Sequence, residues 1–287
     1  MSATPRTTVP SLRGRIGRDR RSGHYPVPHR YRLHLSPSCP ECLRVAITHE
    51  LLDLSEVLPV HWLPAVPDAP GEGYTALVPL YEASWHHHPG PATAPVLSDG
   101  WTGRIVSDHL PDILVDLAHQ FGDQRPELYP EAAEPLLRTV DRLCADGLED
   151  AAQRAGQADV GPLQRAEALD QLLCSMDELT GLLGERRLLW GSEPVAADIR
   201  LWVALLRLDL VHRWHLDALA VHHLAEYADL WAYARRLAAL PAFRAHLDVE
   251  TITRRHHAQC RGLEAAGAAV RIVRWPERRS RSSVPSS

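Results

Sequence analysis

Hydrophobic and polar positions divide the chain into two stretches with different periods. Between residues 30 and 121, runs that alternate apolar and polar residues are interspersed with runs whose apolar residues recur at helical spacing. The predicted strands cover 31–35, 57–62, 94–99 and 104–106, and the predicted helices cover 45–52 and 108–121. The order is therefore strand–helix–strand followed by strand–strand–helix, which indicates an α/β domain.

From residue 127 onward the pattern is helical throughout. The predicted helices cover about 130–153, 163–184, 195–211, 224–239 and 248–260. The third is apolar nearly all round, so we expect it to be the buried central helix of this half. Residues 63–93 are rich in Pro, Gly and His and are predicted to form a long loop. The run His86-His87-His88 within it is typical of a solvated loop more than of a metal site.

The two ends of the chain lack these periods. Residues 1–28 are rich in Arg, Ser, Thr and Pro and carry a single acidic residue. They contain no apolar core of a secretory signal, so we expect a disordered or surface-wrapping extension, although this composition also describes an organelle transit peptide. The tail, 263–287, becomes basic and Ser-rich from Arg274 and is predicted to be disordered. The two domains between them are expected at 29–121 and 127–262.

Composition narrows the functional classes. The 287 residues are 45% hydrophobic, enough for a sizeable core. A net charge of -5 gives no electrostatic case for binding nucleic acid or an anionic membrane, and no apolar run approaches the ~18 residues of a membrane helix. Five scattered cysteines are typical of a reducing cytoplasm rather than of a secreted disulfide framework. The absence of lysine and asparagine indicates a GC-rich, bacterial coding bias.

Cys39 is the strongest candidate for chemistry. It lies between the first predicted strand and the first predicted helix, and Pro40 after it suits the first turn of a helix. The helix dipole and free N–H groups at that point favour an anion, and thiols there commonly have pKa values lowered to about 3.5–7.5. We therefore predict a reactive thiolate. Three alternatives stay open: a buried structural cysteine, half of a zinc site, and a glutaredoxin-like dithiol centre formed with Cys42.

Several stretches together resemble a known family. Ser38-Cys39-Pro40 after the first strand, the element order, and the segments 80–82 with 93–99, 197–209 and 227–233 resemble the glutathione transferase superfamily. More narrowly, they resemble the xi class, the glutathionyl-hydroquinone reductases, over about residues 30–260. The resemblance implies an N-terminal thioredoxin-like domain, which binds the thiol, followed by a helical glutathione-transferase-type bundle, which binds the substrate.

The resemblance also implies roles for individual residues. Cys39 would be the nucleophile, and Pro95 would be the cis proline of the thioredoxin-like domain. The backbone of Ala94 would pair with the cysteinyl part of the thiol, and Asp198 would cap the first turn of the central helix. The implied activity removes glutathione from quinone-type S-conjugates through a mixed disulfide on Cys39. Glutathione would be a co-substrate, with no bound cofactor and no metal, and the protein would be a homodimer.

The chain departs from the family at the thiol-binding positions. His109 and Leu110 stand where the family has the Glu-Ser pair that holds the γ-glutamyl group, and Tyr74 stands for a family tryptophan. Ser107 and Asp108 are the residues that could supply the missing contacts by a shift of register. In the predicted acceptor pocket, histidines replace tyrosines and are candidate proton donors, and Trp214 nearby could line a pocket for a flat substrate. These histidines are His212, His256 and His257.

Three interpretations of these departures remain open. The thiol could be mycothiol, a sugar thiol of GC-rich actinobacteria that lacks a γ-glutamyl group. Cys42 could act as a resolving thiol, which would make the protein a dithiol oxidoreductase. The fold could also have lost catalysis and serve as a binding protein.

Overall fold

The computed structural model describes residues 11–19, 23–121, 126–260 and 265–276. The chain separates into two compact units, residues 1–130 and 131–287. The first unit has a small mixed sheet with helices, and the second is helical, so the α/β-plus-helical fold class predicted from the sequence is confirmed.

A four-stranded sheet forms the centre of the first unit, in the order β4-β3-β5-β6. Its strands are β3 (Tyr31–Leu35), β4 (Val60–Trp62), β5 (Val96–Asp99) and β6 (Arg104–Ser107). β4 runs parallel to β3, whereas β5 and β6 continue the sheet antiparallel. In β3, Tyr31, Leu33 and Leu35 are buried while the residues between them are not, the period of two that the sequence shows.

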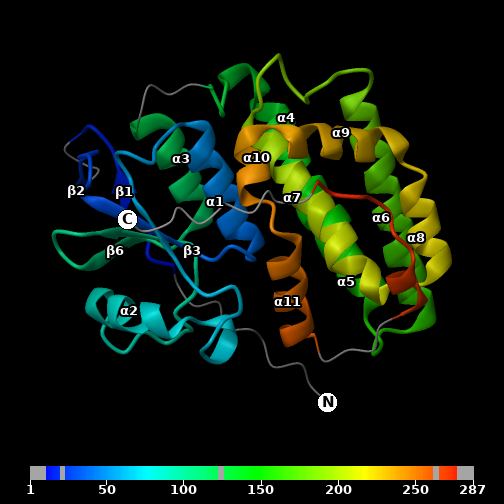
Figure 1. Cartoon of the computed structure of the whole chain (residues 1–287), viewed down its shortest axis with the longest axis horizontal. Coiled ribbons are helices and arrows are strands. Elements are labelled where there is room, and N and C mark those ends of the chain that lie inside the picture. The colour runs from blue at the N-terminus through cyan, green and yellow to red at the C-terminus, as the bar shows by residue number, and fades with distance from the viewer. Residues whose placement is uncertain (1–10, 20–22, 122–125, 261–264, 277–287) are drawn as a thin grey trace, which may run out of the picture. The chain divides into compact units, whose positions relative to one another are not determined.

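Helices cover both faces of this sheet (Figure 1). α1 (Pro40–Leu51) and α3 (Leu110–Gln120) pack together on one face, and α2 (Val78–Ser84) lies on the other against β6. The prediction of a continuous loop over 63–93 is therefore wrong for part of its length, because α2 and two short 3-10 turns, Pro70–Glu72 and Thr75–Leu77, lie within it. The helix was not predicted because proline is frequent in this stretch and usually disfavours helix. Pro79, however, lies in the first turn of α2, where proline is tolerated.

The N-terminal segment is docked on the first unit. β1 (Arg15–Ile16) pairs in parallel with β2 (Gly23–His24), and two arginines reach α3. Arg13 Nε lies 2.8 Å from Asp112 Oδ2, and Arg15 Nη2 lies 2.6 Å from Asp116 Oδ1. The disordered alternative is thus wrong for 11–19 and 23–28, which wrap the surface. Residues 1–10 and 20–22 lie outside the described residues.

Every regular element in the described part of the second unit is helical. They are α4 (Glu134–Arg142), α5 (Ala151–Gly156), α6 (Pro162–Leu183), α7 (Ala196–Leu210), α8 (Ala218–Ala225), α9 (Ala228–Ala239), α10 (Pro241–His246) and α11 (Val249–Gln259). Short turns are η3 (Glu131–Ala133), η5 (His212–His215) and η6 (Ala266–Ala269). α7 is buried almost throughout and contacts α4, α9 and α11, as its apolar sequence predicts.

Two predicted helices are interrupted. The one predicted at 130–153 contains a π-helical segment, η4 (Leu143–Asp150), between α4 and α5. The one predicted at 224–239 is two helices, because the chain leaves the helix at Tyr227 between α8 and α9. Periodicity alone does not detect either irregularity, since apolar residues keep an approximately helical spacing through both.

The described part of the C-terminal tail packs into the second unit. Trp275 is 8% exposed, and its indole Nε1 donates to Asp209 Oδ2 over 2.7 Å. Its ring also meets Trp202 of α7 edge-on, with 6.1 Å between the ring centroids. The predicted disorder is therefore wrong for Arg274–Pro276, whereas 277–287 lie outside the described residues.

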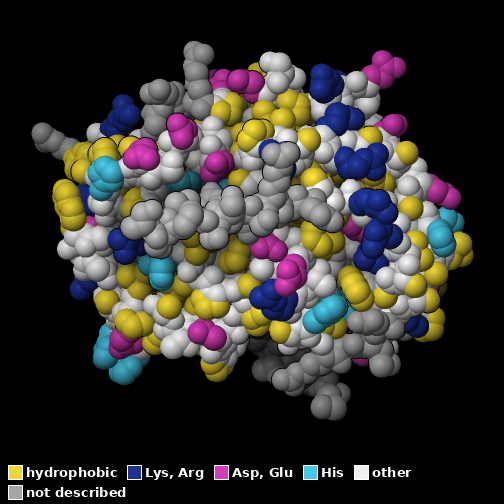
Figure 2. All heavy atoms as spheres, in the orientation of Figure 1, with side chains coloured by type: hydrophobic (Ala, Val, Ile, Leu, Met, Phe, Trp, Pro, Cys, Tyr) yellow, Lys and Arg dark blue, Asp and Glu magenta, His cyan; other side chains and the backbone are white. Residues whose placement is uncertain are grey.

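The surface mixes both charge signs. On the face drawn in Figure 2, arginine side chains gather in a band over the helical unit, and acidic side chains are scattered across both units. Among the described residues, no helix is long and apolar enough to span a bilayer.

Candidate active site

Cys39 is the N-cap residue of α1, with Pro40 at the first helical position, where the sequence predicted it. Its backbone carbonyl accepts the bond from Leu43 N at 2.9 Å, so its side chain lies at the helix N-terminus, beside the free N–H groups of the first turn. The residue is 7% exposed. Its Sγ lies 3.9 Å from the carbonyl oxygen of Ala94.

The segments around the thiol are held in place by the backbone and by two serines. The Ala94–Pro95 peptide bond is cis, as the resemblance implies. Before the cysteine, Ser36 Oγ donates to the carbonyl of Pro64 at 2.9 Å, and Ser38 Oγ donates to the carbonyl of Ala65. Both serines are buried, so the loop that presents Cys39 is anchored to the chain following β4.

Cys42 lies one turn further along α1 and differs from Cys39 in environment. It is completely buried, and burial raises the pKa of its thiol well above the ordinary value, with a hydrogen bond to Cys39 acting in the same direction. The thiolate is the nucleophile in disulfide exchange. Cys42 therefore stays protonated and is poorly suited to the resolving role.

The connection from the end of β6 to the N-cap of α3 carries the predicted thiol-binding residues Ser107, Asp108 and His109. Ser107 is completely buried and its Oγ accepts from His109 N at 3.1 Å, so its side chain has no surface to offer a ligand. The expectation that Ser107 contacts the thiol is therefore wrong for its side chain. His109 Nδ1 lies 3.0 Å from Asp112 Oδ2, which turns this imidazole toward its own helix.

Asp108 belongs to a small polar network with two other segments. Its Oδ1 accepts from Leu12 N at 2.8 Å, and its Oδ2 lies 3.3 Å from the hydroxyl of Tyr81, which also donates to the carbonyl of Thr93. Burial raises the pKa of the Asp108 carboxyl and also that of the Tyr81 hydroxyl. The carboxylate retains spare lone pairs and partial exposure, so of Ser107 and Asp108 only the latter can contact a ligand.

Tyr74 is held inside the first unit. It is 1% exposed, and its backbone N donates to the carbonyl of Ala92 at 2.8 Å. Tyr74 therefore supports the chain segment that leads to Ala94 and Pro95. Its burial disfavours direct contact between its side chain and a bound thiol.

The predicted acceptor-pocket residues lie in the second unit. His212 is 7% exposed, and burial lowers the pKa of its imidazole well below the ordinary value. Burial also lowers the pKa of His256 to about 4, with the neighbouring His215 contributing. His257 packs edge-on against Trp214, with 5.1 Å between the ring centroids. Burial thus favours the uncharged form of both imidazoles, which makes them weaker acids than an imidazolium, and their role as proton donors stays a prediction.

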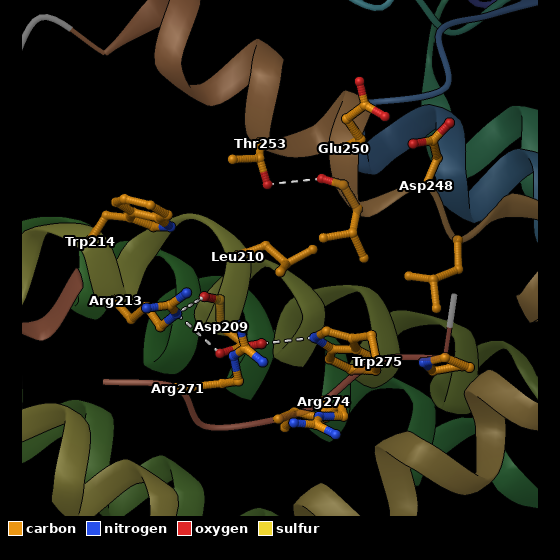
Figure 3. A pocket seen from close by; sticks show the side chains of 14 residues that line it. Asp209, Leu210, Arg213, Trp214, Asp248, Glu250, Thr253, Arg271, Arg274 and Trp275 are labelled. Atoms are coloured by element: carbon orange, nitrogen blue, oxygen red, sulfur yellow. Dashed lines mark hydrogen bonds and ion pairs between the residues drawn. The ribbon is translucent and has the colours of Figure 1, made fainter. Parts of the chain in front are cut away.

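A pocket of about 740 Å³ in the second unit is lined by Trp214 and by the C-terminal segment (Figure 3). Asp209 and Arg213 lie on one wall, paired at 3.1 Å, and Trp275 faces Asp209. Trp214 lines this pocket, whereas none of the three predicted acceptor histidines does, and the binding of a flat substrate beside Trp214 stays a prediction.

Asp198 is a structural residue, as the resemblance implies. It is completely buried near the start of α7, where its two oxygens accept from Val195 N and Leu189 N, both at 2.9 Å, and from the hydroxyl of Tyr233 at 2.7 Å. The bonded donors belong to the N-cap residue and the loop before it rather than to the first turn itself. This carboxylate therefore ties the entry of α7 to α9.

Sequence reasoning missed several residues of these sites. Tyr81 was matched only as part of a family motif, and its bond to Asp108 joins residues 27 apart in sequence. His215 and Cys260, whose Nε2 and Sγ atoms lie 3.4 Å apart, were not selected because the resemblance gives them no role. The spacing of three between His212 and His215 was the available signal for the latter.

Comparisons with known proteins extend over most of the chain. The chain is 27% identical over 268 residues to the glutathionyl-hydroquinone reductase YqjG of Escherichia coli, covering 86% of this chain and 80% of the relative. It is 27% identical to the glutathionyl-hydroquinone reductase PcpF of Sphingobium chlorophenolicum, covering 74% and 72% of the two chains. No family model matches the sequence.

Solved structures agree with these relatives. A glutathione transferase from Gordonia bronchialis superimposes with a TM-score of 0.76 at 28% identity, over 86% of this chain and 82% of that one. The glutathione-bound structure of E. coli YqjG superimposes with a TM-score of 0.72 at 25% identity, over 84% and 83%. With the fold, the place of Cys39 and the cis Ala94–Pro95 bond, these likenesses show that the chain is similar in sequence and structure to glutathione transferases, and among them to the glutathionyl-hydroquinone reductases.

Proposed function

We propose that this protein is a cysteine-dependent reductase that removes a low-molecular-weight thiol from quinone-type S-conjugates. The observation that carries the proposal is the position of Cys39 as N-cap of α1, with its sulfur facing the Ala94 carbonyl beside a cis proline. The N-terminus of a helix stabilises a thiolate there. The curated relatives named glutathionyl-hydroquinone reductases supply the substrate class.

The reaction balances as two thiol exchanges. The Cys39 thiolate attacks the sulfur of the conjugate, a sulfur–sulfur bond forms, and the bond from sulfur to the aromatic carbon breaks. The electron pair of that bond stays with the carbon, which takes up a proton, so free hydroquinone leaves. A second thiol molecule then attacks the mixed disulfide and releases the oxidised thiol dimer and Cys39 thiolate. Together, the conjugate and one free thiol give hydroquinone and one disulfide: the aromatic carbon is reduced, and the sulfur of the conjugate and that of the free thiol are oxidised.

The dithiol alternative is not supported. Cys42 is buried with a raised thiol pKa, so it lacks the thiolate needed to resolve the mixed disulfide. The curated relatives are named as reductases of glutathionyl conjugates, which likewise favours a monothiol cycle and an enzyme over a binding protein.

The identity of the thiol depends on the start of α3. The Glu-Ser pair that the family uses for the γ-glutamyl group is replaced by His109 and Leu110, and Ser107 is buried. Asp108 remains as the carboxylate for an ammonium group, but Leu110 cannot replace a hydroxyl donor. Glutathione is the proposed co-substrate on the strength of the relatives, and mycothiol is the alternative to be tested beside it.

The test compares turnover by matched cysteine variants. S-glutathionyl-hydroquinone and its mycothiol counterpart are each supplied with the corresponding thiol, and release of hydroquinone is followed. Cys39→Ser should lower the rate by about a thousandfold or more, since the nucleophile is removed. Cys42→Ser and Cys174→Ser should stay within about threefold of the unmodified protein. Retention of activity by Cys39→Ser, or loss with Cys42→Ser in a folded protein, would overturn the proposal.

Assembly and location are part of the same proposal. We infer a homodimer from the resemblance. Size-exclusion chromatography with light scattering measures the mass, and a monomer at micromolar concentration would contradict the inference. We propose a cytoplasmic location, because five cysteines scattered along the sequence are typical of a reducing compartment rather than of a secreted disulfide framework.

A further inference from the structure

Three metal-binding side chains converge inside the helical unit. His215 Nε2 lies 3.2 Å from His256 Nε2, and Cys260 Sγ lies 3.4 Å from the same His215 atom. All three atoms lie within 4.8 Å of one another, and all three residues are partly buried. No role in the proposed thiol exchange falls to this cluster as a whole.

The local sequence explains why these side chains meet. His256 and Cys260 are four residues apart at the end of α11, and the bond from Cys260 N to His256 O, 2.7 Å, continues the helical turn. They therefore share one face. His215 ends η5 and is packed closely against α5, where a Cβ on Gly156 would come within 2.7 Å of His215 Cβ. Because Gly156 has no side chain, η5 can pack closely against α5, and this packing fixes the position of the His215 Cβ.

Two of the three separations are close to the edges of a tetrahedral zinc site, and the third, between His256 Nε2 and Cys260 Sγ, is within 4.8 Å. Zinc binds histidine nitrogen at about 2.0–2.1 Å and cysteine sulfur at about 2.3 Å, so tetrahedral geometry places two nitrogens about 3.3 Å apart and nitrogen and sulfur about 3.6 Å apart. The observed 3.2 and 3.4 Å are close to these edges. A hydrogen-bonded cluster fits less well, because the His215 nitrogen has either one hydrogen or one lone pair to share between two facing atoms.

We propose that His215, His256 and Cys260 bind a Zn²⁺ ion in the helical unit. Two imidazole nitrogens and one thiolate are a donor set that zinc prefers, with water completing four-coordination. His212, at the start of the same short turn, is 7% exposed, and its Nε2 has no hydrogen-bond partner among the described residues.

The first test uses the unmodified full-length protein. Zinc chloride is titrated into metal-free protein, and alkylation of each cysteine by iodoacetamide is followed by mass spectrometry with and without zinc. Zinc should slow modification of Cys260 at least about tenfold, because the coordinated thiolate is withdrawn from reaction. The exposed Cys174 of the same unit is the internal control and should react at an unchanged rate.

Variants then assign the ligands. Cys260→Ser and His256→Ala should each weaken zinc affinity by about a hundredfold or more. Groups that only hold a ligand in place by a hydrogen bond usually change metal affinity by about 10–100-fold, and a direct ligand should matter at least as much. Cys174→Ser and the double variant Cys39→Ser/Cys42→Ser should bind zinc as the unmodified protein does. Unchanged alkylation of Cys260 in the presence of zinc, or loss of binding in the Cys39/Cys42 variant, would overturn the proposal. The alkylation result decides the matter even where a ligand variant fails to fold.

Discussion

At the scale of single residues, two cysteines one helical turn apart are given opposite properties by their surroundings. Cys39 is the N-cap residue of α1 and keeps a small exposed fraction, whereas Cys42 faces the interior with its thiol pKa raised by burial. The motif Cys-x-x-Cys therefore does not by itself identify a dithiol centre. Position relative to the helix N-terminus and access to solvent decide which sulfur reacts.

Asp99 at the end of β5 gives a pH-dependent prediction. It is 1% exposed, its oxygens lie 2.7 and 3.1 Å from the Arg30 guanidinium, and this hydrogen-bonded pair lowers the carboxyl pKa below its ordinary 3.8. The unfolded chain then binds more protons below about pH 5, so the pair stabilises the fold above that range and the benefit is lost as pH falls through the lowered pKa.

Asp99→Asn should therefore lower the free energy of unfolding by about 1–3 kcal/mol at pH 7. The difference from the unmodified protein should shrink as the pH is lowered toward 3. Urea unfolding at several pH values measures this, with the exposed Asp53→Asn as control. A difference that stays constant between pH 7 and pH 3 would contradict the assignment.

At the scale of elements, docking of the N-terminal segment on α3 depends on charge pairs between residues about a hundred positions apart. Asp116 accepts from Arg15 at 2.6 Å and from Ile16 N at 2.8 Å, although only 1% of the residue is exposed. Loss of this carboxylate leaves a buried backbone donor and a guanidinium without their acceptor.

Asp116→Ala should release the segment 11–19 while the sheet stays folded. Hydrogen exchange at Ile16 should then rise at least about tenfold, because opening of this segment would no longer break the bonds to Asp116. Glu56→Ala, an exposed carboxylate of the same unit, is the control and should leave that exchange unchanged. Unaltered protection of Ile16 in the Asp116 variant would show that other contacts hold the segment.

Two glycines of the helical unit form a matched pair. A Cβ on Gly147, in the π-helical segment, would come within 2.1 Å of Ser175 Oγ on α6, whereas a Cβ on Gly181 of α6 would meet nothing within 4 Å. The first glycine allows η4 and α6 to approach, and the second only weakens its helix.

Gly147→Ala should accordingly lower the unfolding free energy by about 1–3 kcal/mol through overpacking. Gly181→Ala should raise it by about 0.5–1 kcal/mol, the helix propensity gained. Thermal and urea unfolding of both variants measure the two signs. If both changes stabilise the protein, the close packing of η4 against α6 is not as described.

At the scale of the whole molecule, sequence reasoning identified the features that depend on local order. The strand–turn–helix around Cys39 and the apolar α7 could be predicted because neighbouring residues determine them. The N-terminal segment and Trp275 could not, because their partners Asp116 and Asp209 are far away in sequence. Composition alone classed both ends as disordered.

Only the central residues of the candidate site, Cys39 and Pro95, could be predicted from the sequence. Cys39 and the cis Pro95 followed from motif and resemblance, and both are found where expected. Burial of Ser107 and the low pKa of His256 could not be predicted, because side-chain packing and desolvation are absent from a linear pattern.

The central claim is that Cys39 alone carries the thiol during turnover. The direct measurement mixes the full-length protein with S-glutathionyl-hydroquinone or its mycothiol counterpart in the absence of free thiol, quenches with acid, and maps the cysteines by fragmentation mass spectrometry. The Cys42→Ser variant, treated alike, assigns the modified residue without ambiguity. We predict one equivalent of hydroquinone released and one thiol adduct on Cys39 in both proteins. A Cys39–Cys42 disulfide, or no adduct on Cys39 with either conjugate, would contradict the account.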